Sequence, residues 1–250
     1  WSPDGHWFVM TLITHMRDPY SDIAIVKADG SKEVYNITES AYIDVNPHWA
    51  LDGNAVVYVS NRYGMRSQAS WGSQNDVFIA FMNQDAYDKF RLNKEEYALL
   101  KEMEKDTKDG KKDGKEEGDD SKDKKDKKPK EANEEESSKK QTEVDLEHLQ
   151  DRVARLTPMS SSLSGCVLSK EGDKLYFMSS FEKGYDLWEL DVREKSMKIL
   201  KKMGQGGARL RLDKKGDNIF LLSGGNLQKV ETKGGKSTSI KYDATMRLDY

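Results

Sequence analysis

A turn-and-strand unit that recurs along the chain is the feature that most restricts its fold. Each copy is a polar turn that contains glycine, followed by a short run of β-branched and aromatic residues. The four turns lie at residues 2–7, 47–54, 168–174 and 212–217. Glycine supplies the positive φ that such turns require, and residues of the second kind favour strands. Gly5 and Gly53 are 48 residues apart, and Gly172 and Gly216 are 44 apart.

A period of about 40–50 residues with several strands in each copy is typical of β-propeller blades. We therefore predict an all-β fold, a partial β-propeller of about four four-stranded blades that occupies residues 1–250. The predicted strands are 6–13, 22–28 and 33–38; 46–51, 54–61, 76–82 and 153–157; 165–168, 174–180, 185–191 and 196–202; 208–212, 218–223, 226–232 and 236–242. The first blade has only Trp1 in place of its innermost strand. The sequence thus starts inside a blade, which indicates an excised piece of a longer protein.

A long insertion separates the second and third turns. It spans residues 83–150, within the second blade, between the third strand and the fourth. Its part 101–140 is a low-complexity charged run of mostly Lys, Asp and Glu, with no aromatic residue, Val or Ile. Such a segment buries too little apolar surface to offset its ordering entropy, so we expect it to be largely disordered. A short helix is predicted at about 93–105, and the insertion is expected on the face that carries the Asp-Gly turns.

Composition excludes several classes of function. The formal net charge is −3 and the charged run is mixed in sign, so no basic surface for nucleic acid is expected. The single cysteine, Cys166, leaves no internal disulfide and no cysteine-based zinc site. No apolar run approaches the roughly 20 residues of a membrane span, and no signal peptide is visible.

Two passages resemble known families. The segments 1–5 and 47–53, together with Ser60-Asn61-Arg62, resemble the Ser-Pro-Asp-Gly and Ser-Asn-Arg repeat of TolB-like, prolyl-oligopeptidase-like and tricorn-like propellers. The segment 144–157, which contains Asp145, Arg152 and Arg155, resembles a passage that follows a charged insertion in tricorn-type peptidases. The C-terminal 241–250 resembles the exit from that family's last blade into its helical core.

The tricorn resemblance implies a non-catalytic propeller region of a serine peptidase, one that guides or filters peptide substrates and supports assembly. It implies a PDZ-like module and a catalytic core beyond residue 250 as partners, a homo-oligomer formed through the parent protein, and a periplasmic location, with the cytoplasm as alternative. Two other functions remain open: a TolB-like protein-binding propeller without an associated enzyme, and the propeller cap of a prolyl-oligopeptidase-like hydrolase.

Candidate sites within the chain favour structural interpretations. Ser160-Ser161-Ser162 with His148 and Asp151 could form a catalytic triad, but no Gly-x-Ser-x-Gly turn is present, and a loop between blades is the better interpretation. Asp44, His48 and Asp52 are close in sequence, yet they belong to a strand and a turn. Residues 234–238 resemble the end of a phosphate loop but lie between two predicted strands. We therefore predict no catalytic, cofactor or metal residues.

The large aromatic residues are expected to pack between blades, where each buries about 150–250 Å². They are Trp7, Trp49, Trp71, Trp188, Tyr58, Phe78, Phe177 and Phe220. Trp71 is the exception, because its loop, 63–74, is rich in Ser, Gln and Gly and could contact a partner. For Asn61 and Arg62 we expect hydrogen bonds from the guanidinium that hold blades together.

Overall fold

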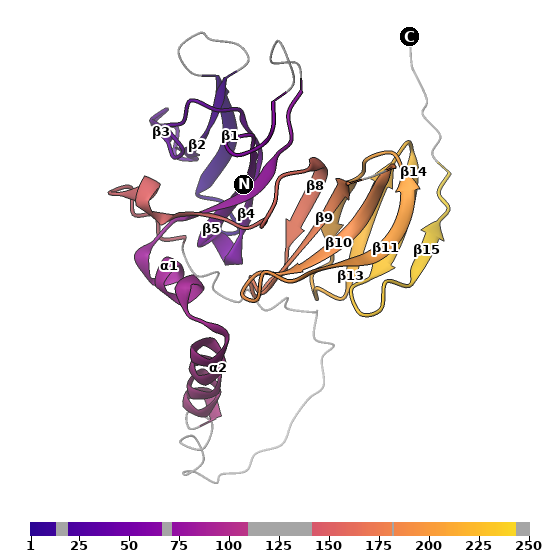
Figure 1. The fold of residues 1–250 in the computed structure, drawn as a ribbon. Coiled ribbons are helices and arrows are strands. Elements are labelled where there is room, and N and C mark those ends of the chain that lie inside the picture. Colours follow the sequence, from indigo (N-terminus) through magenta and orange to yellow (C-terminus); the bar gives the residue numbers. More distant parts are fainter. Residues whose placement is uncertain (14–19, 67–71, 110–141, 182, 244–250) are drawn as a thin grey trace, which may run out of the picture.

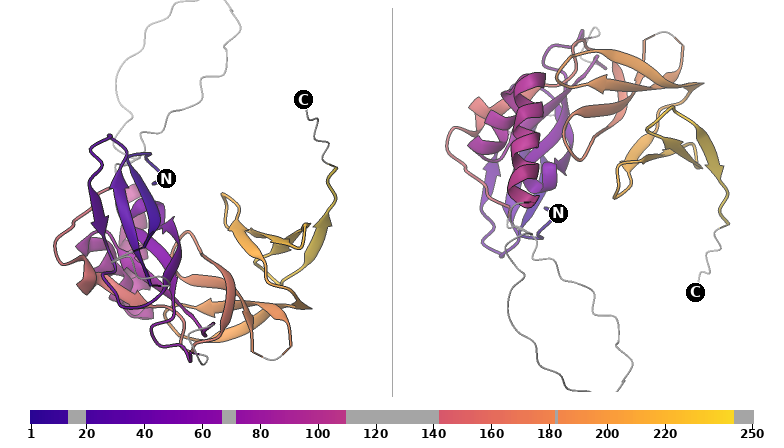
Figure 2. Two further views of the ribbon diagram at one scale, coloured as in Figure 1. Left: turned by 90° about the horizontal axis from the view of Figure 1, so that it is seen from above. Right: turned by 90° about the horizontal axis from the view of Figure 1, so that it is seen from below.

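Four antiparallel sheets follow one another along the chain. The computed structural model describes residues 1–13, 20–66, 72–109, 142–181 and 183–243. Within these residues one sheet has three strands and three have four, and no parallel pairing joins the named strands of a sheet. Figures 1 and 2 show the sheets arranged one after the other around an open arc. The all-β, blade-like architecture predicted from the repeats is confirmed.

The strand boundaries agree with those expected to within a few residues. The first sheet contains β1 (Trp7–Ile13), β2 (Ser21–Lys27) and β3 (Val34–Asn36). The second contains β4 (Asp44–Ala50), β5 (Ala55–Ser60), β6 (Asp76–Phe81) and β7 (Val153–Arg155). The third contains β8 (Ser162–Leu168), β9 (Lys174–Ser180), β10 (Tyr185–Asp191) and β11 (Met197–Gln205). The fourth contains β12 (Arg209–Leu212), β13 (Asn218–Ser223), β14 (Asn226–Glu231) and β15 (Ser237–Ile240).

Strand β7 completes the second sheet from the far side of the insertion. It pairs with β6, with Phe78 opposite Arg155 and Ala80 opposite Val153. Leu156, directly after β7, is fully buried, and its N–H donates to Val77 O at 2.8 Å. The insertion therefore leaves the sheet after β6 and returns into the same sheet.

Alternation along the second strand of each blade decides which sheet each side chain contacts. In β5, Ala55 and Val57 face the third sheet, whereas Val56 and Tyr58 face the first. Both sets are buried, so this strand is apolar on both faces. The same alternation in β1, β9 and β13 produces three cores between neighbouring sheets.

We name these the first, second and third interblade cores. The first includes Trp7, Ile23, Ile25, Val56, Tyr58 and Phe78. The second includes Val57, Ile79, Phe81, Leu175, Phe177 and Leu190. The third includes Tyr176, Met178, Leu187, Leu210, Ile219 and Leu221. Trp49 packs against the first core and Trp188 against the second, as expected of interblade aromatics.

Phe220 belongs to none of the three interblade cores among the described residues. Ile219 and Leu221 are the β13 side chains that enter the third interblade core, so Phe220 between them points to the opposite face of the fourth sheet. Leu222 on that face is 45% exposed. The alternation of side chains along a strand, not hydrophobicity alone, decides which aromatics are buried. Trp71 lies outside the described residues.

Two helices follow β6: α1 (Gln84–Arg91) and α2 (Lys94–Asp109). The sequence indicated a helix only at about 93–105. The Asn83 side chain caps α1 by accepting from Ala86 N at 2.9 Å. Ala86, Tyr87 and Phe90 of α1 pack against the second interblade core. Short 3₁₀ turns occupy Leu51–Gly53 and Leu149–Arg152, and among the described helices none is long and apolar enough to span a membrane. Residues 101–109 of the charged run belong to α2, contrary to the expectation of disorder, and residues 110–140 lie outside the described part.

Candidate functional site

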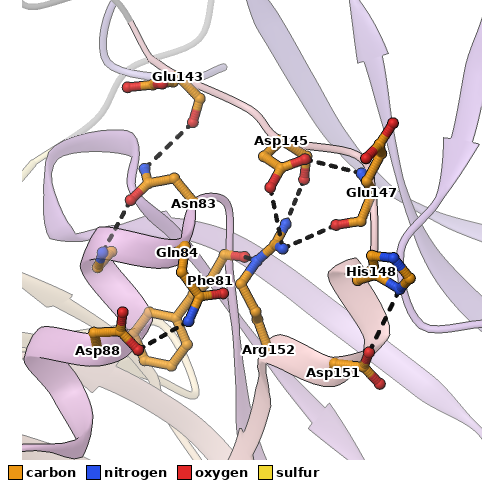
Figure 3. A network of polar contacts seen from close by, with 11 residues as sticks. Phe81, Asn83, Gln84, Asp88, Glu143, Asp145, Glu147, His148, Asp151 and Arg152 are labelled. Atoms are coloured by element: carbon orange, nitrogen blue, oxygen red, sulfur yellow. Dashed lines mark hydrogen bonds and ion pairs between the residues drawn. The ribbon is translucent and has the colours of Figure 1, made fainter.

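Arg152 organises the point where the insertion returns to the second sheet (Figure 3). Its side chain is buried, and Nε donates to Phe81 O at 3.3 Å, at the end of β6. Nη1 donates to Glu147 O at 2.8 Å and Nη2 to Asp145 O at 2.5 Å. Arginine suits this position because its planar fork presents several N–H donors in fixed directions. The Asp145 and Arg152 of the tricorn-like passage thus close the base of the insertion.

The departing and returning chains meet at the turn between β4 and β5. Asn83 Nδ2 donates to Asn54 Oδ1 at 3.0 Å and to Glu143 O at 3.4 Å. Asp145 N donates to Met82 O at 2.8 Å. These contacts fix both ends of the insertion on the face that carries the Asp-Gly turns, as the sequence predicted for its position.

A further contact ties the returning chain to the first sheet. Thr142 N donates to the Asp4 carboxylate at 2.7 Å, and the same carboxylate accepts from Ser2 Oγ and His6 N. Burial alone would raise the pKa of Asp4, but these hydrogen bonds outweigh it and hold the pKa well below its usual range. Gly53 has a φ of 95°, and a Cβ there would lie 2.5 Å from Thr142 Oγ1, so glycine is required for this approach.

Arg193 attaches the helices to the third sheet. It follows β10, and Nη1 donates to Phe90 O at 3.1 Å and to Leu92 O at 2.5 Å. These carbonyls at the end of α1 lack helical partners, so the guanidinium satisfies them and complements the negative end of the helix dipole. The guanidinium carbon also lies 3.6 Å from the centre of the Tyr97 ring in α2. Local sequence patterns could not indicate this contact, which joins residues about a hundred positions apart.

Between the helices and the Asp-Gly turns lies a groove of about 490 Å³. We call it the insertion groove. Its acidic lining residues are Asp52, Asp85, Glu104, Glu143 and Glu171, and its basic lining residues are Lys89, Lys170 and Arg193. Lys89 and Glu104 pair with each other, Glu171 pairs with Lys101, and Arg193 binds the end of α1. Asp52, Asp85 and Glu143 then outnumber Lys170, so the groove has a small excess of carboxylates, which favours cationic or polar groups of a ligand.

The opposite rim of the second sheet stacks arginines on aromatic rings. Arg62 lies 5.3 Å from the centre of the Tyr42 ring and 5.8 Å from that of Phe78. Arg66 lies 5.3 Å from the same Tyr42 ring. The hydrogen bond to the neighbouring segment comes from Asn61, whose Oδ1 accepts from Ile43 N at 3.0 Å. Within the described residues, Arg62 thus contributes ring contacts at this rim, and Asn61 contributes a hydrogen bond to the segment that enters β4.

The serines considered as nucleophiles are held in a buried network. Ser160 Oγ donates to Asp76 Oδ2 at 2.8 Å, and Asp76 also accepts from Arg155 and Thr157. His148 and Asp151 lie 3.7 Å apart, and both side chains are more than 80% exposed. The contacts of Ser160 and of His148 involve different partners, so the structure gives these residues no arrangement of a catalytic triad.

The residues considered for a metal do not converge. Burial raises the pKa of Asp44, whose carboxylate accepts from Ser40 Oγ at 2.7 Å. Burial lowers the pKa of His48, and Asp52 lies in the Leu51–Gly53 turn. In the segments that the structure describes, no three metal-binding side chains form a group. The glycine pair at 234–235, with positive φ, connects β14 and β15, so the 234–238 segment is a hairpin turn.

Comparison with solved structures identifies similar folds. The tricorn protease matches with a TM-score of 0.54 at 11% identity, over 94% of this chain and 21% of that one. TolB from Acinetobacter baumannii also has a TM-score of 0.54, at 10% identity, over 94% of this chain and 41% of that one. A putative TolB from Agrobacterium tumefaciens has a TM-score of 0.51 at 13% identity, covering 95% and 62%. No protein-family model matches the sequence, and no curated protein matches it.

These matches define a propeller-like fold of the kind found in TolB and in the tricorn protease. The identities lie below 25%, so the similarity concerns the fold alone. The chain spans less than two thirds of each of the three structures. Activity and partners must therefore be argued from the side chains described above.

Proposed function

We propose that this chain is the non-catalytic propeller region of a tricorn-like serine peptidase, where it guides or filters peptide substrates and supports assembly. The catalytic core and a PDZ-like module would lie in a further part of a longer, periplasmic protein. The observation that carries the proposal is the Arg152 clamp. It gives a structural role to the passage that resembles tricorn-type peptidases, and it joins the returning end of the insertion to the end of β6, the strand from which the insertion departs.

The insertion groove is the surface on which substrate guidance would act. Its excess of carboxylates attracts the amino groups of peptides and disfavours acidic peptides. The groove would therefore select peptides by their charge. The helices are held by Arg193 and by Tyr97, whose hydroxyl donates to Glu171 O at 3.3 Å. A preorganised groove binds an extended peptide with less loss of conformational entropy than a mobile one.

The test compares peptidase activity of the longer protein with that of residues 1–250 alone, with a serine-directed inhibitor as control. We expect activity in the longer protein only. In that protein, Glu143→Lys with Glu171→Lys should raise KM for lysine-rich peptides several-fold and leave kcat unchanged. Asp217→Lys with Glu231→Lys, in the fourth sheet and not among the residues that line the groove, changes the net charge equally and is the matched control. Cleavage by residues 1–250 that disappears in Ser160→Ala would refute the proposal.

A TolB-like protein-binding propeller is the second candidate. The TolB from Acinetobacter baumannii matches with the same TM-score as the tricorn protease. If the longer protein cleaves no peptide, and a protein partner is lost on Glu143→Lys with Glu171→Lys, this second function replaces the first.

A further inference from the structure

The third sheet carries an apolar hollow at the end where β9 turns into β10. It has a volume of about 1000 Å³, and its apolar lining residues are Phe181, Trp188, Ile199 and Met203. We call it the third-sheet hollow. Phe181 and Trp188 meet edge to face, with ring centres 4.9 Å apart. Phe181 is 40% exposed and Ile199 37%, so large apolar side chains meet water here, as is typical of interaction surfaces.

The third-sheet hollow is open on one side. Every described residue that lines it lies between positions 179 and 204, in the third sheet or in the turn that joins β9 to β10. The described residues of the second sheet do not line it. Small-molecule sites bury about 70–90% of the surface of their ligand, which a hollow with a single wall cannot do. A protein segment, which brings its own surface as the second wall, fits the hollow better.

A further strand cannot add to β11 beside the hollow. The turn between β14 and β15 lies against this strand, since a Cβ on Gly235 would overlap Leu200 O. The pairing of β11 with β10 also has a bulge at this point. Nearby, Met203 N and Gly204 N donate to Asp186 Oδ1 at 2.6 and 2.9 Å. The hollow therefore offers a partner side-chain contacts and no free strand edge.

The charge around the hollow is positive. Lys183 and Lys202 line it, and neither of them forms an ion pair within the described part of the chain. Asp186 is the one carboxylate among the described lining residues, and its Oδ1 is engaged by two main-chain N–H groups. A partner that carries carboxylates beside its apolar contact is therefore attracted to this site.

We propose that the third-sheet hollow docks an amphipathic helix of a partner protein, one whose apolar stripe is flanked by carboxylates. A helix satisfies its own main-chain hydrogen bonds, so it needs only the side-chain contacts that the hollow offers. Side chains three, four and seven positions apart share one face of a helix and pack against Phe181, Trp188 and Ile199. Carboxylates beside this stripe lie near Lys183 and Lys202.

This site does not depend on the insertion groove. The hollow is at the start of β10, whereas Arg193, which lines the groove, follows the end of the same strand. The two sites are thus at opposite ends of the third sheet, and each can be changed without the other.

The test uses the full 250-residue chain and a fluorescently labelled, end-blocked peptide of about 16 residues, long enough to form a helix. Its leucines lie on one face of the helix, with glutamates beside them. Binding is followed by fluorescence anisotropy over a range of salt concentrations, and we expect saturable binding that weakens with salt. A peptide of the same composition with its leucines distributed around the helix should bind at least about tenfold more weakly.

Two aspartate variants test the apolar contact. Ile199→Asp should weaken binding at least about tenfold, because it places a carboxylate among the apolar lining residues. Leu222→Asp makes the same change at a residue of the fourth sheet that is 45% exposed, and it is the matched control. Phe181→Ala is the second variant of the hollow if Ile199→Asp does not fold, which circular dichroism and the unfolding midpoint will show.

Two double variants test the charge. Lys183→Glu with Lys202→Glu should weaken binding by about tenfold and remove most of its salt dependence. Lys214→Glu with Lys215→Glu, in the turn before β13, changes the net charge equally and should leave the affinity within about twofold, because distant charges are screened.

Sedimentation velocity of the chain alone tests another occupant of the hollow. A dimer that Ile199→Asp dissociates would mean that a second copy of the chain covers the hollow, and this would overturn the proposal. The absence of binding by the unmodified chain, equal binding of the two peptides, or full affinity in the folded hollow variants would also overturn it.

Discussion

Arg152 holds Asp145 at two points: its Nη2 donates to the main-chain oxygen at 2.5 Å, and its Nη1 lies 3.2 Å from the carboxylate. One side chain thus binds the returning end of the insertion and, through Phe81 O, the end of the strand from which the insertion departs. The base of the insertion is a closed structure even though its two ends are distant in sequence.

Replacing Arg152 should therefore destabilise the second sheet. In Arg152→Ala the buried carbonyls lose their donor, and each such group costs about 1–3 kcal/mol, partly recovered through water. We expect the free energy of unfolding in urea to fall by about 2–4 kcal/mol. Arg152→Lys should recover only a part, because an ammonium cannot reach three carbonyls in a plane. Arg209→Ala, an exposed arginine of β12, is the control. A change below about 0.5 kcal/mol in Arg152→Ala would contradict the clamp.

Arg193→Ala should release the helices without unfolding the sheets. The carbonyls at the end of α1 lose their donors and the Tyr97 ring loses its cation. Hydrogen exchange in α1 and α2 is expected to accelerate by about tenfold or more, while exchange in β5 and β9 stays the same. Lys94→Ala removes the exposed ion pair with Glu194 and should have little effect. Faster exchange throughout the second and third sheets would mean that Arg193 supports the fold as a whole.

A pair of phenylalanines tests the interblade packing. Phe177 is 1% exposed in the second interblade core, whereas Phe220 lies on the face of the fourth sheet that no described sheet covers. Phe177→Ala should cost about 3–5 kcal/mol, the range for a buried aromatic. Phe220→Ala should cost about 1 kcal/mol, since less surface is buried there. Equal losses by urea denaturation would show that Phe220 is buried in solution.

His48 should make stability depend on pH. Burial favours the neutral ring and lowers the pKa of His48 below its ordinary value of 6.5. Between the lowered pKa of the folded chain and the ordinary pKa of 6.5 in the unfolded chain, the unfolded chain binds a proton that the folded chain does not. The free energy of unfolding therefore falls as the pH is lowered through 6.5. His48→Leu should remove part of this loss between pH 7.5 and pH 5.5, measured by chemical denaturation. His148→Asn, at an exposed histidine, is the control. A steeper loss in His48→Leu would reverse the assignment.

The strands could be predicted because their signals are local. A glycine turn followed by a β-branched run, as at Gly53 and Val56-Val57, specifies both the turn and the strand within a few residues. The fourth strand of the second sheet was also predictable, because 153–157 repeats the ending of the first copy. Helix α1 was missed because its apolar face is small and its burial depends on the neighbouring sheet: Ala86 and Phe90 pack on a core that the helix does not itself contain.

The contacts that form the candidate surfaces could not be predicted. Asp4 accepts from Thr142, and Arg193 binds the end of α1, across about a hundred residues or more of sequence. The sequence around a charged residue in a turn does not indicate which distant residue it will contact. The place of β11 at the end of its sheet likewise follows only from the strand order.

The sequence alone determined the period, the turns and the alternation of this propeller-like chain, because each depends on φ/ψ preferences and side-chain directions of adjacent residues. Only the tertiary structure decided which aromatics are buried, where the insertion is attached and which strands lie at the ends of the sheets. These properties depend on which sheets meet, and that is set by the summed packing of residues far apart in the chain.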